Sequence, residues 1–255
     1  MAHGERHLIF LHGHSGLRRA VALALMLGLL SVARGQSAPA TSPHVEVAFT
    51  VFSLNRLDGL HYQPKVGASL LALEFFTQTR SALYHYAGEP ALAFYEANPL
   101  PDAGDPAARP VAVAFLPPGI KRVLLLFAPL TVPAADGRKY GVTVVDDSFD
   151  RLPPGHLAVL NAAAASYVAQ IGGRRITVEC GLSEAVPASG KVRIAFTRFL
   201  PTGWARVASH ELSMNARSRV CLVLFPPASP TGLAPQIRTL VDEARGSDSR
   251  SMADE

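Results

Sequence analysis

Three carboxylates lie close together in one short segment and are the first residues in this chain that could bind a ligand. Asp146, Asp147 and Asp150 belong to the run VVDDSFD, with Ser148 between them. Calcium prefers several oxygen ligands on one loop, so a weak Ca²⁺ site is conceivable here. The spacing and the glycine of an EF-hand are absent, however, and acidic residues before Pro-Pro-Gly usually form a solvated turn. We therefore predict no metal site and no cofactor.

The other residue types that catalyse reactions are scattered. The histidines after the N-terminal segment show neither His-x-His nor His-Glu-x-x-His spacing. No serine has a paired base that the sequence identifies, and no Gly-x-Ser-x-Gly motif follows the His-Gly run at residues 7–16. We predict no catalytic residues and favour a protein that is not an enzyme. The alternative is a secreted enzyme with a site invisible in the sequence, in residues 98–110 or between the two halves of the chain.

Cys180 and Cys221 are the only cysteines of the chain. Each ends or begins an alternating apolar pattern, over residues 176–180 and 221–225, so each is expected on an apolar strand face. An oxidising compartment permits their pairing. We predict a disulfide between Cys180 and Cys221 on facing strands, with two separate buried thiols as the alternative.

Trp204 lies between the two cysteines, an order also found in immunoglobulin domains. The spacing departs from that pattern, and Arg219 stands where the tyrosine two residues before the second cysteine would be. These residues do not support an antibody-type domain, but a looser Ig-like sandwich remains compatible with them.

Aromatic side chains gather in the first half of the chain, at residues 61–62, 84–86 and 94–95. Exposed rings on a sandwich face can stack on sugars, which makes a carbohydrate-binding surface a second alternative function. Tyrosines in strands are more commonly packed in cores and at edges.

The N-terminal segment has the composition of a secretory signal. Residues 18–19 are two arginines, residues 20–31 are apolar, and small residues stand at the −3 and −1 positions before Gln36. We predict a signal peptide over residues 1–35 and no transmembrane segment after its cleavage, because the apolar run is shorter than the about 20 residues that cross a bilayer. The mature protein is expected in the periplasm or at the cell surface.

The formal net charge of +4 belongs largely to this leader, which holds four arginines and one glutamate. Its removal leaves 20 basic and 19 acidic residues. A nearly neutral chain gives no electrostatic reason to bind nucleic acid, so we predict no nucleic-acid partner.

Period-two alternation dominates the mature chain and predicts strands with one buried face. It occurs over residues 45–51, 111–115 and 192–197, with Val111, Val113 and Phe115 on the predicted buried face of the second segment. Residues 123–127 and 220–225 are apolar on both faces and are expected to form central strands. Turn residues separate these runs every 8–15 residues, a spacing typical of an antiparallel β-sandwich.

Two segments have a helical alternative. Residues 160–171 are rich in alanine, but their flanking Pro-Pro-Gly and Gly-Gly favour strand–turn–strand. Near the C-terminus, apolar residues at i, i+3, i+4 and i+7 predict one short helix at about 235–245, followed by a flexible tail.

The chain contains a short internal repeat. LLLFAP at residues 124–129 and LVLFPP at residues 222–227 each close a strand-rich stretch. We therefore predict two tandem Ig-like β-sandwiches, over residues 44–132 and 137–228, with the helix and tail in residues 229–255. A single larger sandwich is the alternative.

Residues 139–181 resemble uncharacterised bacterial exported proteins with Ig-like β-sandwich repeats. In these proteins a Pro-Gly turn leads into a strand that ends near an asparagine, here Pro154-Gly155 and Asn161, and a second strand ends near Gly-Gly. The resemblance implies a fold and no activity. Our functional prediction is a binding or assembly module of the cell envelope, whose partner is an envelope protein or a glycan.

Overall fold

The computed structural model describes residues 44–96 and 109–243, which form strands and connecting loops without a helix. The predicted signal peptide, the C-terminal tail and most of residues 98–110 lie outside this part of the chain. No membrane-spanning helix is found among the described residues.

The strands form four sheets, which we number from the N-terminus. Sheet 1 contains, in order, β4 (Tyr84–Gly88), β1 (Val45–Ser53), β7 (Arg122–Pro129) and β8 (Tyr140–Asp146). Sheet 2 contains β3 (Leu71–Ala72), β2 (Leu60–Tyr62), β5 (Ala91–Glu96) and β6 (Ala112–Phe115). Sheet 3 contains β12 (Gly181–Leu182), β9 (His156–Asn161), β16 (Ser218–Phe225) and β17 (Gln236–Glu243), and β13 (Val186–Pro187) also pairs with β9. Sheet 4 contains β11 (Arg174–Val178), β10 (Tyr167–Ile171), β14 (Gly190–Leu200) and β15 (Gly203–Met214).

The strands β1–β8 and the strands β9–β17 are connected in the same way. With β13 set aside, each strand of the first half has a counterpart with the same neighbours in the second half. In both halves the opening strand pairs in parallel with a late strand, β1 with β7 and β9 with β16. The two copies of the short repeat, at 124–129 and 222–227, lie largely on the equivalent strands β7 and β16. The prediction of antiparallel sheets holds for all other pairs of named strands.

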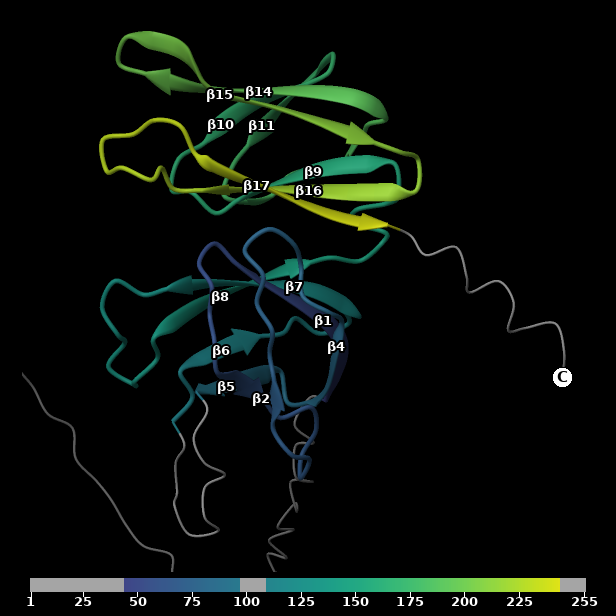
Figure 1. The fold of residues 1–255 in the computed structure, drawn as a ribbon, viewed down its shortest axis with the longest axis vertical. Coiled ribbons are helices and arrows are strands. Elements are labelled where there is room, and N and C mark those ends of the chain that lie inside the picture. The colour runs from purple at the N-terminus through teal and green to yellow at the C-terminus, as the bar shows by residue number, and fades with distance from the viewer. Residues whose placement is uncertain (1–43, 97–108, 244–255) are drawn as a thin grey trace, which may run out of the picture. The chain divides into compact units, whose positions relative to one another are not determined.

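Figure 1 shows the strands of the four sheets. Three groups of buried side chains hold these sheets together. One fills the space between sheets 1 and 2, and another fills the space between sheets 3 and 4. The third joins sheet 1 to sheet 3 and includes Phe52, Leu124, Val223 and Phe225. Alternate residues of β7 and β16 therefore enter different cores, which explains why both segments are apolar on both faces. Their predicted central position in a sheet is confirmed.

Two other predictions about strands are also confirmed. In β14 the residues of one parity are buried, as the alternation indicates. In β1 the predicted face of Val45, Val47, Phe49 and Val51 is buried, but Thr50 on the opposite face is buried as well. Residues 160–171 form the end of β9, a turn and β10, so the strand–turn–strand interpretation is correct.

The predicted buried face of residues 111–115 is correct for Val111 but wrong within β6. Ala112 and Ala114 of β6 are completely buried, whereas 69% of Phe115 is exposed. Ala112 pairs with Phe94, whose ring meets that of Phe127 at a centroid distance of 5.0 Å. Large rings already fill this part of the core, so small side chains fit on the β6 face that meets them.

The predicted C-terminal helix is also wrong, because residues 236–243 form the strand β17. This strand pairs along its whole length with β16, and Cys221 lies opposite Leu240. Leu240 is buried while 48% of Val241 is exposed, which is the alternation of a strand. The backbone hydrogen bonds of β16 and the β-branched residues Ile237, Thr239 and Val241 favour the strand over the helical pattern.

The sheet of the first half extends beyond the predicted boundary at residues 132–137. Residues 130–139 connect β7 to β8, and β8 pairs antiparallel with β7 from Tyr140 to Asp146. Strands of the first half therefore run to Asp146, and those of the second half begin at His156.

Candidate functional site

Several aromatic residues of the first half pack into the core between sheets 1 and 2. Tyr62 and Phe94 are buried, and Tyr84 is packed against the same core. Tyr62 meets Phe49 edge to face at a centroid distance of 5.0 Å. These rings stabilise the core between sheets 1 and 2.

The acidic segment contributes to a buried ion-pair network instead of a metal site. Arg219 is fully buried, and its Nη2 donates hydrogen bonds to Oδ2 of Asp147 at 3.0 Å and to Oδ2 of Asp242 at 2.7 Å. Arg80 donates to the same oxygen of Asp147. Arg122 completes the network, with its Nη2 2.7 Å from Oδ2 of Asp242. Three guanidinium groups thus face two carboxylates where the two halves meet.

The environment keeps the Asp147 carboxylate ionised. Burial by itself raises the pKa of Asp147, but the charges of Arg80, Arg219 and Arg122 and the hydrogen bond from Arg80 bring it below its ordinary value. The other two members of the acidic segment are separate: Asp146 accepts a hydrogen bond from the Ser148 backbone, and Asp150 is exposed. Residues 44–96 and 109–243 contain no group of three metal-ligating side chains.

The predicted disulfide is not formed in the structure. Cys221 of β16 is buried in the core between sheets 1 and 3, on the face opposite to Val220 and Leu222. Cys180 follows the end of β11, is exposed, and donates a weak hydrogen bond from its Sγ to the Ala163 carbonyl at 3.3 Å. Ile176 and Val178, which precede it in β11, point into the core between sheets 3 and 4. The two thiols therefore lie on different sides of sheet 3, and burial raises the pKa of Cys221 to about 11.

The most distinctive exposed surface lies on sheet 4, on the face turned away from the core. At one end of the β14–β15 hairpin, Phe199 and Trp204 are opposite each other in the register. Their rings meet edge to face at a centroid distance of 5.4 Å, yet 66% of Phe199 and 59% of Trp204 remain exposed. Gly203, whose φ of 109° is open to glycine but strained for other residues, begins β15 and allows this tight hairpin.

Cationic side chains surround the tryptophan. The Arg175 guanidinium, from the opposite edge strand β11, lies 5.8 Å from the centre of the Trp204 ring. Arg206, two residues after Trp204, lies on the same face of β15. Neither arginine forms an ion pair with another described residue, whereas Arg193 binds Glu211 at 2.9 Å. We call Gln170, Arg175, Arg193, Trp204 and Arg206 the arginine–tryptophan face.

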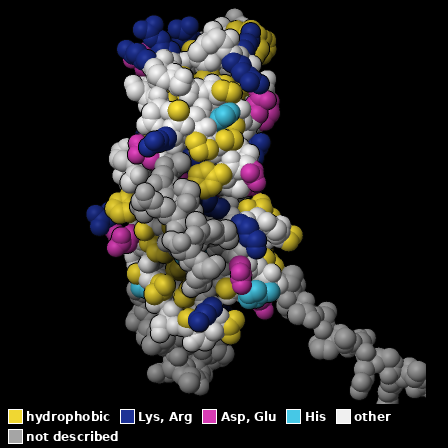
Figure 2. All heavy atoms as spheres, turned by 90° about the vertical axis from the view of Figure 1, so that its right-hand side faces the viewer, with side chains coloured by type: hydrophobic (Ala, Val, Ile, Leu, Met, Phe, Trp, Pro, Cys, Tyr) yellow, Lys and Arg dark blue, Asp and Glu magenta, His cyan; other side chains and the backbone are white. Residues whose placement is uncertain are grey.

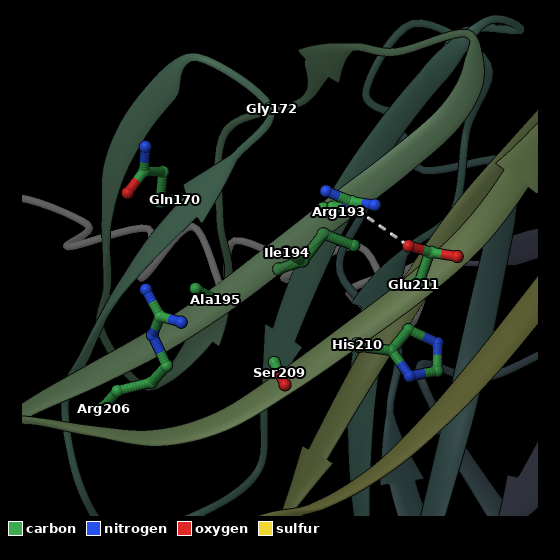
Figure 3. A pocket seen from close by; sticks show the side chains of 9 residues that line it. All are labelled: Gln170, Gly172, Arg193, Ile194, Ala195, Arg206, Ser209, His210 and Glu211. Atoms are coloured by element: carbon green, nitrogen blue, oxygen red, sulfur yellow. Dashed lines mark hydrogen bonds and ion pairs between the residues drawn. The ribbon is translucent and has the colours of Figure 1, made fainter.

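Two hollows run across this face. The larger has a volume of about 520 Å³, and the smaller, of about 310 Å³, includes Trp204 and Arg175 in its lining. Both are lined by Gln170, Ala195 and Arg206, so they form one groove across the strands. Figure 3 shows Gln170 and Arg206 at one end of the larger hollow, the Arg193–Glu211 pair at the other, and the small side chains of Ala195 and Ser209 between them. Figure 2 shows Lys and Arg side chains gathered at the end of the molecule that carries sheet 4.

Ser209, His210 and Glu211 are neighbours in this groove without forming a catalytic triad. Consecutive strand residues point to opposite faces, and the Nε2 of His210 lies 2.8 Å from the Thr239 hydroxyl on β17. The Glu211 carboxylate binds Lys191 and Arg193 instead, and hydrogen bonds from these two residues lower its pKa. Burial lowers the pKa of His210. The arrangement provides donors and an aromatic surface for binding, and no activated nucleophile.

A comparison with models of protein families finds no match, and a comparison with curated protein sequences finds none either. The binding surface therefore has to be identified from geometry. Sequence reasoning treated Trp204 only as an immunoglobulin marker. The signal that points to the surface is the alternation of residues 203–206, in which Trp204 and Arg206 alternate with the small residues Gly203 and Ala205 and so lie on one face.

Proposed function

We propose that this chain is an exported binding module of the cell envelope, built from two tandem Ig-like β-sandwiches over residues 45–146 and 156–243. Export rests on the leader at residues 1–35. The tandem architecture is supported by the equal connectivity of the two halves and by a separate core in each. A parallel pairing of an early strand with a late one closes each half.

The binding function is assigned to the arginine–tryptophan face. The observation that carries this assignment is a largely exposed tryptophan beside two arginines without ion pairs among the described residues. Aromatic residues and arginine are enriched at protein interfaces, so a largely exposed tryptophan and two arginines together on one face are typical of a surface that meets a partner. The groove beside these residues gives the binding surface a concave part.

The test is co-sedimentation of the mature chain with the isolated cell envelope. We expect the wild-type protein to bind and Trp204→Ala to bind at least about tenfold more weakly, a change that corresponds to about 1.4 kcal/mol. Phe115→Ala is the matched control, because it removes another ring of similar exposure on sheet 2. Equal binding of the wild type and Trp204→Ala would assign the envelope contact to another surface.

A further inference from the structure

The arginine–tryptophan face has the chemistry of a site for an acidic sugar. We propose that it binds an acidic polysaccharide, with Trp204 stacked on a sugar ring and Arg206 and Arg175 bound to the carboxylate of that sugar or its neighbour. This inference rests on the proposed binding function and adds the class of ligand.

The charge of the groove favours an anion. Arg193 and Lys191 share the single carboxylate of Glu211, at 2.9 and 2.8 Å, while Arg175 and Arg206 have no carboxylate partner among the described residues. The groove therefore keeps an excess of positive charge within a mature chain that is nearly neutral as a whole. A guanidinium can bind a carboxylate through two parallel hydrogen bonds, which gives geometric selectivity as well as attraction.

The positions of the side chains suit a chain of sugars lying across the strands. Trp204 and Arg206 are two residues apart on one face of β15, a separation of about 7 Å along the strand. Arg175 approaches Trp204 from β11, although β10 and β14 lie between these strands. Both side chains line the smaller hollow. The groove continues past Gln170 and Ser209, whose amide and hydroxyl can bind sugar hydroxyls.

The surface is less suited to the other polyanions. A protein interface usually has a contiguous apolar centre, and here Trp204 and Phe199 are the only large exposed apolar side chains of sheet 4. An acidic peptide would use the arginines but would not need the ring. Nucleic acid would require a broader positive field than a chain with 20 basic and 19 acidic mature residues supplies.

The test uses the mature chain and four probes: polygalacturonate, dextran as a neutral polysaccharide, polyglutamate as an acidic peptide, and the isolated envelope. We expect polygalacturonate to bind, more weakly at high salt because exposed charges are screened. Trp204→Ala and Arg206→Gln should each weaken this binding by about tenfold or more. Arg206→Lys should restore only part of it, since lysine lacks the fork of donors.

Two control variants carry matched changes elsewhere. Phe115→Ala removes an exposed ring of the first half, and Arg217→Gln removes an exposed arginine beyond the far end of β15. Both should bind polygalacturonate like the wild type, and circular dichroism should show all variants folded.

The outcomes separate this inference from the proposed function. Absence of polygalacturonate binding, or binding that Trp204→Ala leaves unchanged, overturns the acidic-sugar assignment. If dextran binds as tightly as polygalacturonate, the carboxylate does not contribute to binding. If polyglutamate binds as tightly, an acidic protein is the better partner. Either result also overturns the acidic-sugar assignment. If the envelope still binds in a Trp204-dependent manner in these cases, the binding face stands and only its ligand class is wrong.

Discussion

Asp147 connects more of the molecule than any other single carboxylate described above. It follows β8 in the first half and accepts hydrogen bonds from Arg80 of the same half and from Arg219 of β16. The backbone carbonyl of Asp147 also accepts a hydrogen bond from Nη1 of Arg219 at 2.8 Å. The ring of Phe149 covers this arginine, 4.4 Å from its Cζ. Charge, hydrogen bonds and an aromatic face together compensate the burial of one guanidinium.

Replacement of Asp147 by asparagine should destabilise the protein strongly. The variant would leave three guanidinium groups with the single carboxylate of Asp242, and breaking a buried ion pair typically costs about 3–5 kcal/mol. Urea unfolding at neutral pH measures this difference. Asp58→Asn is the control, since Asp58 pairs with Arg56 at the exposed surface and such pairs contribute at most about 1 kcal/mol. A loss of similar size in both variants would contradict a special role for Asp147.

The contribution of Asp147 should depend on pH in a defined direction. Its folded-state pKa is lowered, so the ionised carboxylate stabilises the fold above the unfolded-state value of about 3.9. This stabilisation is lost as the pH falls through the lower folded-state pKa. The stability difference between the wild type and Asp147→Asn should therefore be largest near neutral pH and shrink below about pH 4. A difference that stays constant from pH 7 to pH 2 would show that the carboxylate is not responsible.

Sequence reasoning identified some important residues but gave them the wrong chemistry. The acidic segment was noticed, yet Arg80, Arg219 and Asp242, which surround Asp147, are remote from it in the chain. Nothing local distinguishes a buried ion pair from a solvated acidic turn. The same holds for the cysteines: alternation placed Cys221 correctly in a buried strand, but only the arrangement of sheets shows that Cys180 lies on the other side.

At the scale of strands, prediction from sequence succeeded where the hydrophobic pattern of a segment fits only one kind of secondary structure. Regular alternation identified β1 and β14, and doubly apolar runs identified β7 and β16 as central strands. Prediction failed for β17, because residues 237, 240, 241 and 244 match a helical stripe. The neighbouring strand decided the outcome, since β16 provides a complete row of backbone partners. Local sequence does not contain that information.

The strand β17 can be tested by two adjacent substitutions. Leu240 is buried in the core between sheets 1 and 3, so Leu240→Ala should cost about 2–5 kcal/mol of stability. Val241 points outward, and Val241→Ala should cost much less, within about 1 kcal/mol. In a helix both residues would lie on the same apolar stripe, so the two substitutions would lower the stability by similar amounts. Chemical denaturation of the two variants measures the difference.

At the scale of the whole molecule, the third core makes the two halves depend on each other. The rings of Phe52 and Phe225 lie 6.1 Å apart across the contact between sheets 1 and 3. Either half alone would expose these apolar faces to water. The stability of each half should therefore include a contribution from the other.

We accordingly expect the mature chain to unfold in one cooperative transition, with equal calorimetric and van't Hoff enthalpies. Phe52→Ala should lower the midpoint of that single transition, at a cost of about 3–5 kcal/mol. Scanning calorimetry checks both expectations. Two resolved transitions, with only one shifted by the substitution, would mean that the halves unfold independently.

Export makes a prediction about the mature protein itself. Cleavage after Gly35 leaves Gln36 as the first residue, and cleavage after Ala40, the second site that the sequence allows, leaves Thr41. Mass spectrometry of protein purified from the native envelope distinguishes the two. A mature chain that retains residues 11–19 would contradict the leader assignment and, with it, the expected location.

The parallel pairing of first and late strands also affects how the chain folds. Ala48 of β1 pairs with Arg122 of β7, and Leu157 of β9 pairs with Val220 of β16, so each half completes its sheets only when nearly all of its sequence is available. Contacts between distant residues slow folding, because a long loop must be ordered before they form. A nascent chain that lacks β7 has no partner for one edge of β1 and stays open. If the chain is exported as we propose, this late closure would keep it unfolded until synthesis is nearly complete, which is the state that a secretion channel needs.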